Sequence, residues 1–140
     1  MPSVFTKIIA GEIPGRFVWK DDRVVVFLTV NPLKPGHVLV VPREEVDHWI
    51  DLPADLAAHL MGVARTVGQA LMGAFAPTKI GLTVVGLEVR HAHLHLVPIH
   101  GVADMTFGTE DKNPDPAALD TAAEAIRTQL RRMGHTEAAG

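Results

Sequence analysis

The run VRHAHLHLVPI, residues 89–99, decides the fold because it places a histidine at every second position, at His91, His93 and His95. Side chains of a β-strand alternate between two faces, so this spacing puts the three histidines on one face and the apolar residues between them on the other. The apolar set is typical of a strand packed on a core. We therefore expect a strand with a polar face that is available for chemistry.

Three histidines in this register are compatible with more than one chemistry. The outer two lie ~13 Å apart on a straight strand, so one metal ion, with bonds of ~2 Å, cannot bind all three. A metal site would need ligands from a wider pool, namely His37, His48, Glu88 and His100. Alternatively, one neutral imidazole attacks phosphorus while a neighbour donates a hydrogen bond. A solvated stripe without a chemical role is disfavoured because eight histidines seldom fall in this register.

Hydrophobic patterns on both sides of this run predict four more strands and three helices. Strands are expected at 16–20, 23–29, 37–42, 79–86 and 93–99, and helices at 4–10, 53–75 and 115–133. The order is helix, three strands, helix, two strands, helix. This order predicts an α+β domain with a mainly antiparallel sheet rather than repeated βαβ units.

Local signals set several of these boundaries. The pair Asp21-Asp22 separates two apolar runs and predicts a hairpin. Asp115 is expected to cap the last helix, with Pro116 at its first position and Gly134 as its stop. The buried stripe of that helix is expected to contain Leu119, Ala123, Ile126, Leu130 and Met133.

The long central helix, 53–75, has an apolar stripe at helical spacing but also three glycines, Gly62, Gly68 and Gly73. Glycine weakens a helix intrinsically. These glycines would be explained if the helix packed closely against another element, such as a second subunit.

Composition limits the class of protein. A chain of 140 residues suits one domain, 1–140, and no segment has the ~20 apolar residues of a membrane span. Thirteen basic against sixteen acidic residues argue against a broad nucleic-acid-binding surface. Because there is no cysteine, disulfides and thiolate chemistry are excluded. No signal peptide is recognisable, so we expect a cytoplasmic enzyme or binding protein.

The segment His91–Val97 resembles, position for position, the signature of the histidine triad family. Residues 4–53 also resemble the N-terminal half of that family, including Pro-Gly-His-x-Leu-Val-x-Pro at 35–42. The resemblance covers about residues 3–107, and the helix at 115–133 is less diagnostic.

This resemblance implies a homodimer of five-stranded antiparallel subunits that bind a purine nucleotide of the AMP type. It also implies a nucleotide hydrolase or transferase that works through a nucleotidyl-histidine intermediate, with no metal and no other cofactor. By resemblance His93 is the nucleophile, and the backbone carbonyl of His91 accepts a hydrogen bond from it. His95 binds the phosphate or assists the leaving group, and His37 contacts the phosphate region.

The ligand pocket that the resemblance implies is apolar at the base and ribose. It contains Val4, Phe5, Ile8, Phe27 and Val30, and the ligand-binding set also includes Thr29, Asn31, Leu87 and Glu88.

The sequence departs from the family pattern at several of these positions. Thr29 replaces an acidic residue or Asn that holds the ribose hydroxyls in many members, and Leu87 replaces a Gln. Glu88 stands where some members have a small hydroxyl residue near the phosphate. Ser3 and Thr6 occupy the positions of a zinc-binding Cys-x-x-Cys pair, so we expect no structural zinc.

The leading hypothesis is cleavage of a nucleoside 5′-phosphoramidate or a related nucleotidyl bond. Hydrolysis of dinucleoside polyphosphates is the alternative within the same class, and the short loop before the histidines disfavours it. Thr29 and Glu88 support a different alternative, a nucleotide-binding module with weak turnover. A two-histidine metal hydrolase has the least support.

Overall fold

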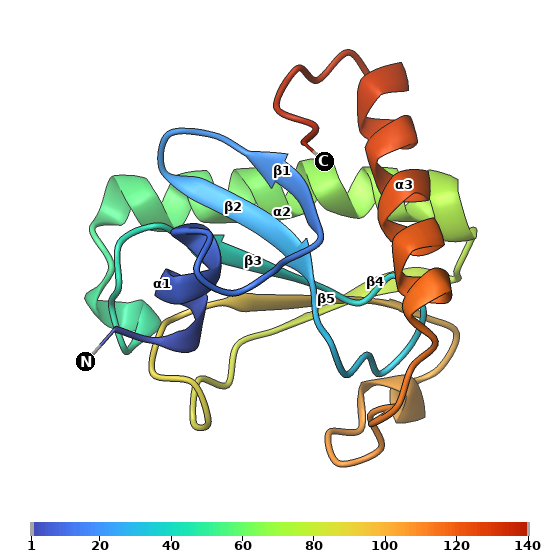
Figure 1. Ribbon diagram of the computed structural model, residues 1–140, viewed down its shortest axis with the longest axis horizontal. Helices are drawn as coiled ribbons and strands as arrows, with labels where there is room; N and C mark the ends of the chain where they lie inside the picture. Colours follow the sequence, from blue (N-terminus) through green and yellow to red (C-terminus); the bar gives the residue numbers. More distant parts are fainter. Residues whose placement is uncertain (1, 140) are drawn as a thin grey trace.

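A computed structural model describes residues 2–139, which form a five-stranded sheet with helices on both faces (Figure 1). The elements are α1 (Val4–Ile9), β1 (Phe17–Lys20), β2 (Val24–Leu28), β3 (Val38–Pro42), η1 (Trp49–Asp51), α2 (Ala54–Phe75), β4 (Lys79–Thr83), β5 (Leu94–Ile99), η2 (Val102–Met105) and α3 (Pro116–Arg132). Neighbouring strands are all antiparallel, in the order β1-β2-β3-β5-β4. The predicted α+β architecture is therefore confirmed.

The sheet separates two apolar layers because the side chains of its strands alternate. In β2, Val24 and Val26 face the large core beneath α2 and α3, whereas Val25 and Phe27 face α1. Figure 1 shows α2 behind the sheet and α1 in front of it. The predicted hairpin joins β1 to β2, and the Asp21 carboxylate accepts hydrogen bonds from the backbone N–H groups of the two residues that begin the return strand.

The central helix α2 buries its predicted stripe against the sheet, but its glycines have different neighbours. Pro53 occupies the N-cap of α2 rather than its first turn. A Cβ added at Gly73 would lie 2.7 Å from the side chain of Gln129, so this glycine allows close packing of α3 on α2. Gly62 has nothing within 4 Å. Within residues 2–139, no helix combines the length and apolar composition needed to cross a membrane.

The C-terminal helix α3 begins as predicted, with the Asp115 side chain accepting from the N–H of Ala117 and Pro116 as the first residue. Four residues of the predicted stripe are buried, but Met133 is 38% exposed, so that part of the prediction was wrong. The reason is that α3 ends at Arg132, and Met133 forms its C-cap instead of another helical turn.

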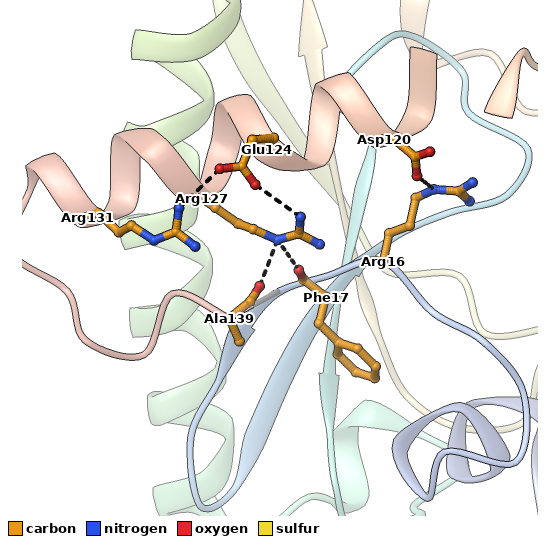
Figure 2. Close-up of polar contacts among 7 residues, drawn as sticks. All are labelled: Arg16, Phe17, Asp120, Glu124, Arg127, Arg131 and Ala139. Carbon is orange, nitrogen blue, oxygen red and sulfur yellow. Dashed lines mark hydrogen bonds and ion pairs between the residues drawn. The ribbon is translucent and has the colours of Figure 1, made fainter. Parts of the chain in front are cut away.

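Polar contacts hold α3 against the edge of the sheet (Figure 2). The Nε–H group of Arg127 lies 2.8 Å from the carbonyl oxygens of both Phe17 in β1 and Ala139 near the end of the chain. Arg16 forms an ion pair with Asp120 at 2.7 Å. These contacts place α3 beside the start of β1, a position that no pattern in α3 itself predicted.

The histidine-bearing segment departs from the predicted strand. β4 ends at Thr83 instead of residue 86, and β5 begins at Leu94, so His91 and His93 precede the strand. Residues 84–93 leave the sheet, and the N–H of Ala92 donates to the carbonyl of Val46 at 2.7 Å. This hydrogen bond to a segment distant in sequence takes the place of the hydrogen bonds that a regular strand would form with its neighbour in the sheet.

The predicted division between the two faces is nevertheless confirmed. His95 pairs with Leu39 on the α1 side of the sheet, and His91 and His93 lie against the ring of Phe5 in α1. The intervening residues Ala92, Leu94 and Leu96 are buried in the core beneath α2.

Candidate active site

A cavity of about 740 Å³ lies on the α1 side of the sheet. Four loops and Asp120 of α3 complete it: residues 14–16, the β2–β3 loop, residues 85–89 and residues 107–112. Of the thirteen predicted site residues, twelve line it: Val4, Phe5, Ile8, Phe27, Thr29, Val30, Asn31, His37, Leu87, Glu88, His93 and His95. His91 does not line the cavity and lies fully buried beside it.

The His93 ring is fixed by the residue two positions before it. Its Nδ1 atom lies 2.7 Å from the carbonyl oxygen of His91. A carbonyl can only accept, so Nδ1 carries the proton and donates, which leaves Nε2 of the neutral ring with an exposed lone pair. The ring is 5% exposed and is held edge-on by Phe5, with ring centroids 4.8 Å apart. This geometry favours a nucleophile.

The His95 ring has the opposite tautomer because a backbone amide sets it through His37. The N–H of Leu33 donates to Nδ1 of His37 at 2.9 Å, so the proton of neutral His37 is on Nε2. That Nε2 lies 3.0 Å from Nδ1 of His95 and donates to it. The proton of neutral His95 is therefore on its own Nε2, which makes His95 a hydrogen-bond donor on the cavity side.

Burial keeps this histidine cluster uncharged at neutral pH. Burial lowers the pKa of His37 to about 4. Burial, followed by the neighbouring His93 and His37, lowers the pKa of His95 to about 3. Burial also lowers the pKa of His93, against the opposing effect of its hydrogen bond to the His91 carbonyl. One ring thus offers a lone pair and its neighbour, 4.8 Å away between centroids, offers an N–H.

The end of the cavity nearest α1 is apolar. Phe5 and Phe27 are buried and meet edge to face at 5.5 Å between centroids. Val4 and Val30 are 42% and 63% exposed, although both are apolar and line the cavity. A flat apolar ring bound between these side chains would cover them, which is the environment that a nucleoside base needs.

The polar residues near this end differ in whether they have a partner within the protein. The Thr29 hydroxyl oxygen accepts from the N–H of Asn31 at 3.3 Å, which leaves its proton for a ligand. Glu88 lines the cavity, whereas Arg90 lines a second, smaller cavity on the other side of the loop. Among residues 2–139, no salt bridge joins Glu88 to a basic side chain.

Sequence reasoning missed the side of the cavity that comes after η2. The ring of Phe107 lies edge-on to His95 at 5.0 Å between centroids. Glu110 and Lys112 come next along the cavity, and Arg16 with Asp120 closes another side. Hydrogen bonds from the backbone N–H groups of Glu110 itself and Gly108, together with the Lys112 ammonium, lower the pKa of Glu110. No sequence pattern connects these residues, because only tertiary packing brings them to the cavity.

The pool of possible metal ligands named from the sequence does not converge. His48 accepts from the N–H of Ile50, and His100 contacts the hydroxyl of Thr78. Among residues 2–139, no group of three or more histidine, cysteine, aspartate or glutamate side chains has the arrangement of a metal site.

Comparisons with known proteins find related sequences and structures that cover most of this chain. A family model described as the HIT domain matches residues 10–102. An uncharacterized HIT-like protein of Methanocaldococcus jannaschii is 37% identical over 129 residues, which are 89% of this chain and 98% of that protein. A protein of Arabidopsis thaliana named as an adenylylsulfatase is 27% identical, over 92% of this chain and 68% of its own length. The crystal structure of a Hit-like protein from Bartonella henselae matches with a TM-score of 0.78 at 27% identity, over 91% of this chain and 96% of that one.

Proposed function

Because this chain belongs to the HIT domain family, we propose that it is a nucleotide hydrolase or transferase that cleaves nucleoside 5′-phosphoramidates or related nucleotidyl bonds. The single observation that carries the proposal is the opposite tautomers of His93 and His95, set by a backbone carbonyl and a backbone amide. A nucleophile and a hydrogen-bond donor side by side are what displacement at phosphorus requires.

In the proposed first step, Nε2 of His93 attacks the α-phosphorus and the bond to the leaving nitrogen breaks. His95 donates a hydrogen bond from Nε2 to a phosphate oxygen or to the leaving nitrogen, which takes one proton from water and leaves as a neutral amine. In the second step, water attacks the phosphorus of the nucleotidyl-histidine and gives up one proton to the solvent. The nucleoside monophosphate leaves, and the electron pair of the phosphorus–nitrogen bond returns to Nε2 of His93. No metal is required in this scheme, as the family resemblance implies.

The charges around the cavity support an amine leaving group over a polyphosphate. Arg16 is paired with Asp120 at 2.7 Å, and Lys112 faces Glu110. The four histidines are neutral at pH 7 because the pKa of each is lowered, chiefly by burial. Glu88 lines the cavity and forms no salt bridge among residues 2–139, so its carboxylate disfavours the several negative charges of a dinucleoside polyphosphate.

We propose a purine nucleotide of the AMP type as the ligand, with its base against Phe5 and Phe27. The exposed apolar side chains of Val4 and Val30 support this orientation. The Thr29 hydroxyl can donate one hydrogen bond to a ribose oxygen.

The proposed assembly is a homodimer formed along β4. The outer edge of β1 bonds to residues near the C-terminus through Lys20 and Glu137, whereas β4 pairs only with β5 among residues 2–139. Leu82 on β4 is 42% exposed. Leu82→Lys should give monomers in light scattering, whereas Val102→Lys, on an exposed residue outside the sheet, should not. A dimer that survives Leu82→Lys would contradict this interface.

The deciding experiment for the proposed function is the intact mass of the protein mixed with an adenosine phosphoramidate. The quench avoids acid because phosphorus–nitrogen bonds to histidine are acid-labile. We expect a transient gain of one nucleoside monophosphate, unaffected by chelator and missing in His93→Ala. Tight nucleotide binding without adduct or product would instead support the binding module.

A further inference from the structure

The four residues Ser3, Thr6, Glu45 and His91 form a polar cluster at the start of α1, outside the cavity. They come from three parts of the chain separated by about forty residues each. None of them lines the cavity, so the proposed mechanism has no direct use for their side chains. We call this set the α1 cluster.

The hydrogen bonds of the α1 cluster converge on His91. The Ser3 hydroxyl lies 2.7 Å from Nδ1 of His91, and Nε2 of the same ring lies 2.7 Å from the carbonyl oxygen of Pro42. Because that carbonyl can only accept, Nε2 carries the proton, and Nδ1 must accept from Ser3. The ring of His91 is fully buried, so both of its nitrogens need these partners.

Glu45 holds the other side of the α1 cluster in place. Its Oε1 atom accepts from the backbone N–H of Ser3 at 2.7 Å and from the Thr6 hydroxyl at 2.6 Å. The Ser3 hydroxyl also accepts from the N–H of Thr6 at 3.0 Å as the N-cap of α1. One carboxylate therefore fixes both hydroxyl residues, and hydrogen bonds from Ser3 and Thr6 lower the pKa of Glu45 so that it stays charged.

The α1 cluster is connected directly to the nucleophile. The residue whose ring it fixes, His91, also supplies the carbonyl that accepts from Nδ1 of His93 at 2.7 Å. The next residue, Ala92, is held by the Val46 carbonyl, next to Glu45. Rotation of the His91 peptide would move the acceptor of His93, so the orientation of the nucleophile depends on how firmly His91 is held.

The same short helix reaches the cavity from its other side. Val4, Phe5 and Ile8 of α1 line the apolar end, while Ser3 and Thr6 of its first turn belong to the α1 cluster. Phe5 contacts both Phe27 in that apolar end and the ring of His93. One short helix with its N-cap thus supplies both the apolar side chains that line the cavity and the hydroxyl groups that hold His91.

We propose that Ser3, Thr6 and Glu45 are positioning residues that align His93 through His91, and that α1 thereby links the nucleoside end of the cavity to the nucleophile. This inference rests on the proposed function. It assigns the three residues a role in the rate of the chemical step and none in nucleotide affinity.

The first test compares Ser3→Ala with the conservative Ser3→Thr. Ser3→Ala removes the donor to Nδ1 of His91, and Ser3→Ala/Thr6→Val also removes the second hydroxyl, which lies 3.5 Å from that nitrogen. We expect kcat on an adenosine phosphoramidate to fall about tenfold in Ser3→Ala with KM unchanged. Ser3→Thr should restore most of the rate, because it keeps the hydroxyl.

Glu45 offers a test that does not disturb the buried ring. Its side chain is exposed, so truncation is compatible with folding. Glu45→Ala should lower kcat, whereas Glu45→Gln keeps an acceptor oxygen and should retain most of it. Glu44→Ala is the matched control, since the neighbouring Glu44 is also exposed and belongs to no part of the site.

A spectroscopic readout separates this inference from the proposed function. In protein labelled with ¹⁵N-histidine, His93 should show a protonated Nδ1 and His91 a protonated Nε2. In Ser3→Ala/Thr6→Val the Nδ1–H signal of His93 should shift or exchange faster, even if phosphoramidates prove to be no substrates. Folded variants with unchanged kcat, or with an unchanged His93 signal, would overturn the inference.

Discussion

This molecule contains two pairs of histidines whose ring nitrogens have opposite roles: the first pair provides a lone pair, and the second provides an N–H donor. The first pair, His91 and His93, is held by carbonyl oxygens: Pro42 accepts from His91, and His91 accepts from His93. The second pair, His37 and His95, begins at a backbone N–H, that of Leu33. The carbonyl of His91 leaves a lone pair on the other nitrogen of His93, whereas the N–H of Leu33 leaves, through His37, an N–H on His95.

The comparison teaches that the backbone partner, rather than the histidine, assigns the role. A neutral imidazole has one donor and one acceptor nitrogen, so fixing either one fixes the other. Both pairs are buried enough to stay neutral, and no charged side chain is needed for the distinction. If this is correct, substitutions in the two pairs should affect different steps and by different amounts.

The largest effect is expected at His93. Replacing it with Ala removes the lone pair that attacks phosphorus, so turnover of an adenosine phosphoramidate should fall by about 10⁴-fold or more. Steady-state kinetics at saturating substrate measure this loss, with AMP affinity by calorimetry showing that the pocket persists. His59→Ala, on an exposed helix face, is the control and should be indistinguishable from wild type. Turnover within about tenfold of wild type would remove the nucleophile assignment.

A smaller effect is expected at His95. His95→Ala removes one N–H donor but leaves the nucleophile, so kcat should fall about 100-fold. The loss should depend on the leaving group: poor amine leaving groups should suffer more than good ones, because the donor assists departure. Rapid-quench measurements would locate the defect in formation of the nucleotidyl-histidine. Equal losses for all leaving groups would contradict a role in departure and leave only phosphate binding.

The fold was predictable because its signals are local. The apolar runs, the Asp21-Asp22 hairpin and the Asp115 cap all act within a few residues, and each appears where expected. Apart from Met133, which lies just beyond the end of α3, the error in the histidine-bearing segment occurs where a distant contact decides. The strand before His93 is interrupted because Ala92 bonds to Val46, and the sequence around Ala92 carries no sign of that partner.

The candidate site was likewise predictable only in part. The alternation of the histidines predicted that they lie on one face of the sheet. Resemblance to the family predicted the apolar end of the cavity near Phe5. The resemblance also implied that the His91 carbonyl accepts from His93, which sets the His93 tautomer. The tautomer of His95 could not be predicted, because it depends on the backbone amide of Leu33 acting through His37. Phe107 was missed because it approaches the site only through the loop after η2.

A third prediction uses pH to test whether His37 and His95 are neutral in the folded protein. Their folded-state pKa values of about 4 and about 3 lie below the 6.5 of an ordinary histidine, so the unfolded chain binds more protons between these limits. The free energy of unfolding should therefore fall as pH decreases from 6.5 to 4, by at most about 1.4 kcal/mol per pH unit for each ring. Denaturant titrations at several pH values should show a smaller slope for His37→Gln/His95→Gln. The variant His59→Gln, at an exposed position, should keep the full slope, and equal slopes for all three proteins would contradict the neutral assignment.

The smallest effect is expected at Glu88, which lines the same cavity as His37, His93 and His95. Because these three histidines carry no positive charge at neutral pH, they do not offset the repulsion between Glu88 and a bound phosphate. Glu88→Ser should therefore tighten AMP binding by up to about fivefold, as expected for a partly exposed charge. Calorimetry at rising salt should show the advantage shrinking, since salt screens the repulsion in the wild type, whereas Glu44→Ser should change nothing. Unchanged affinity for Glu88→Ser would mean that the carboxylate turns away from the ligand, and the charge argument against polyphosphate substrates would then fail with it.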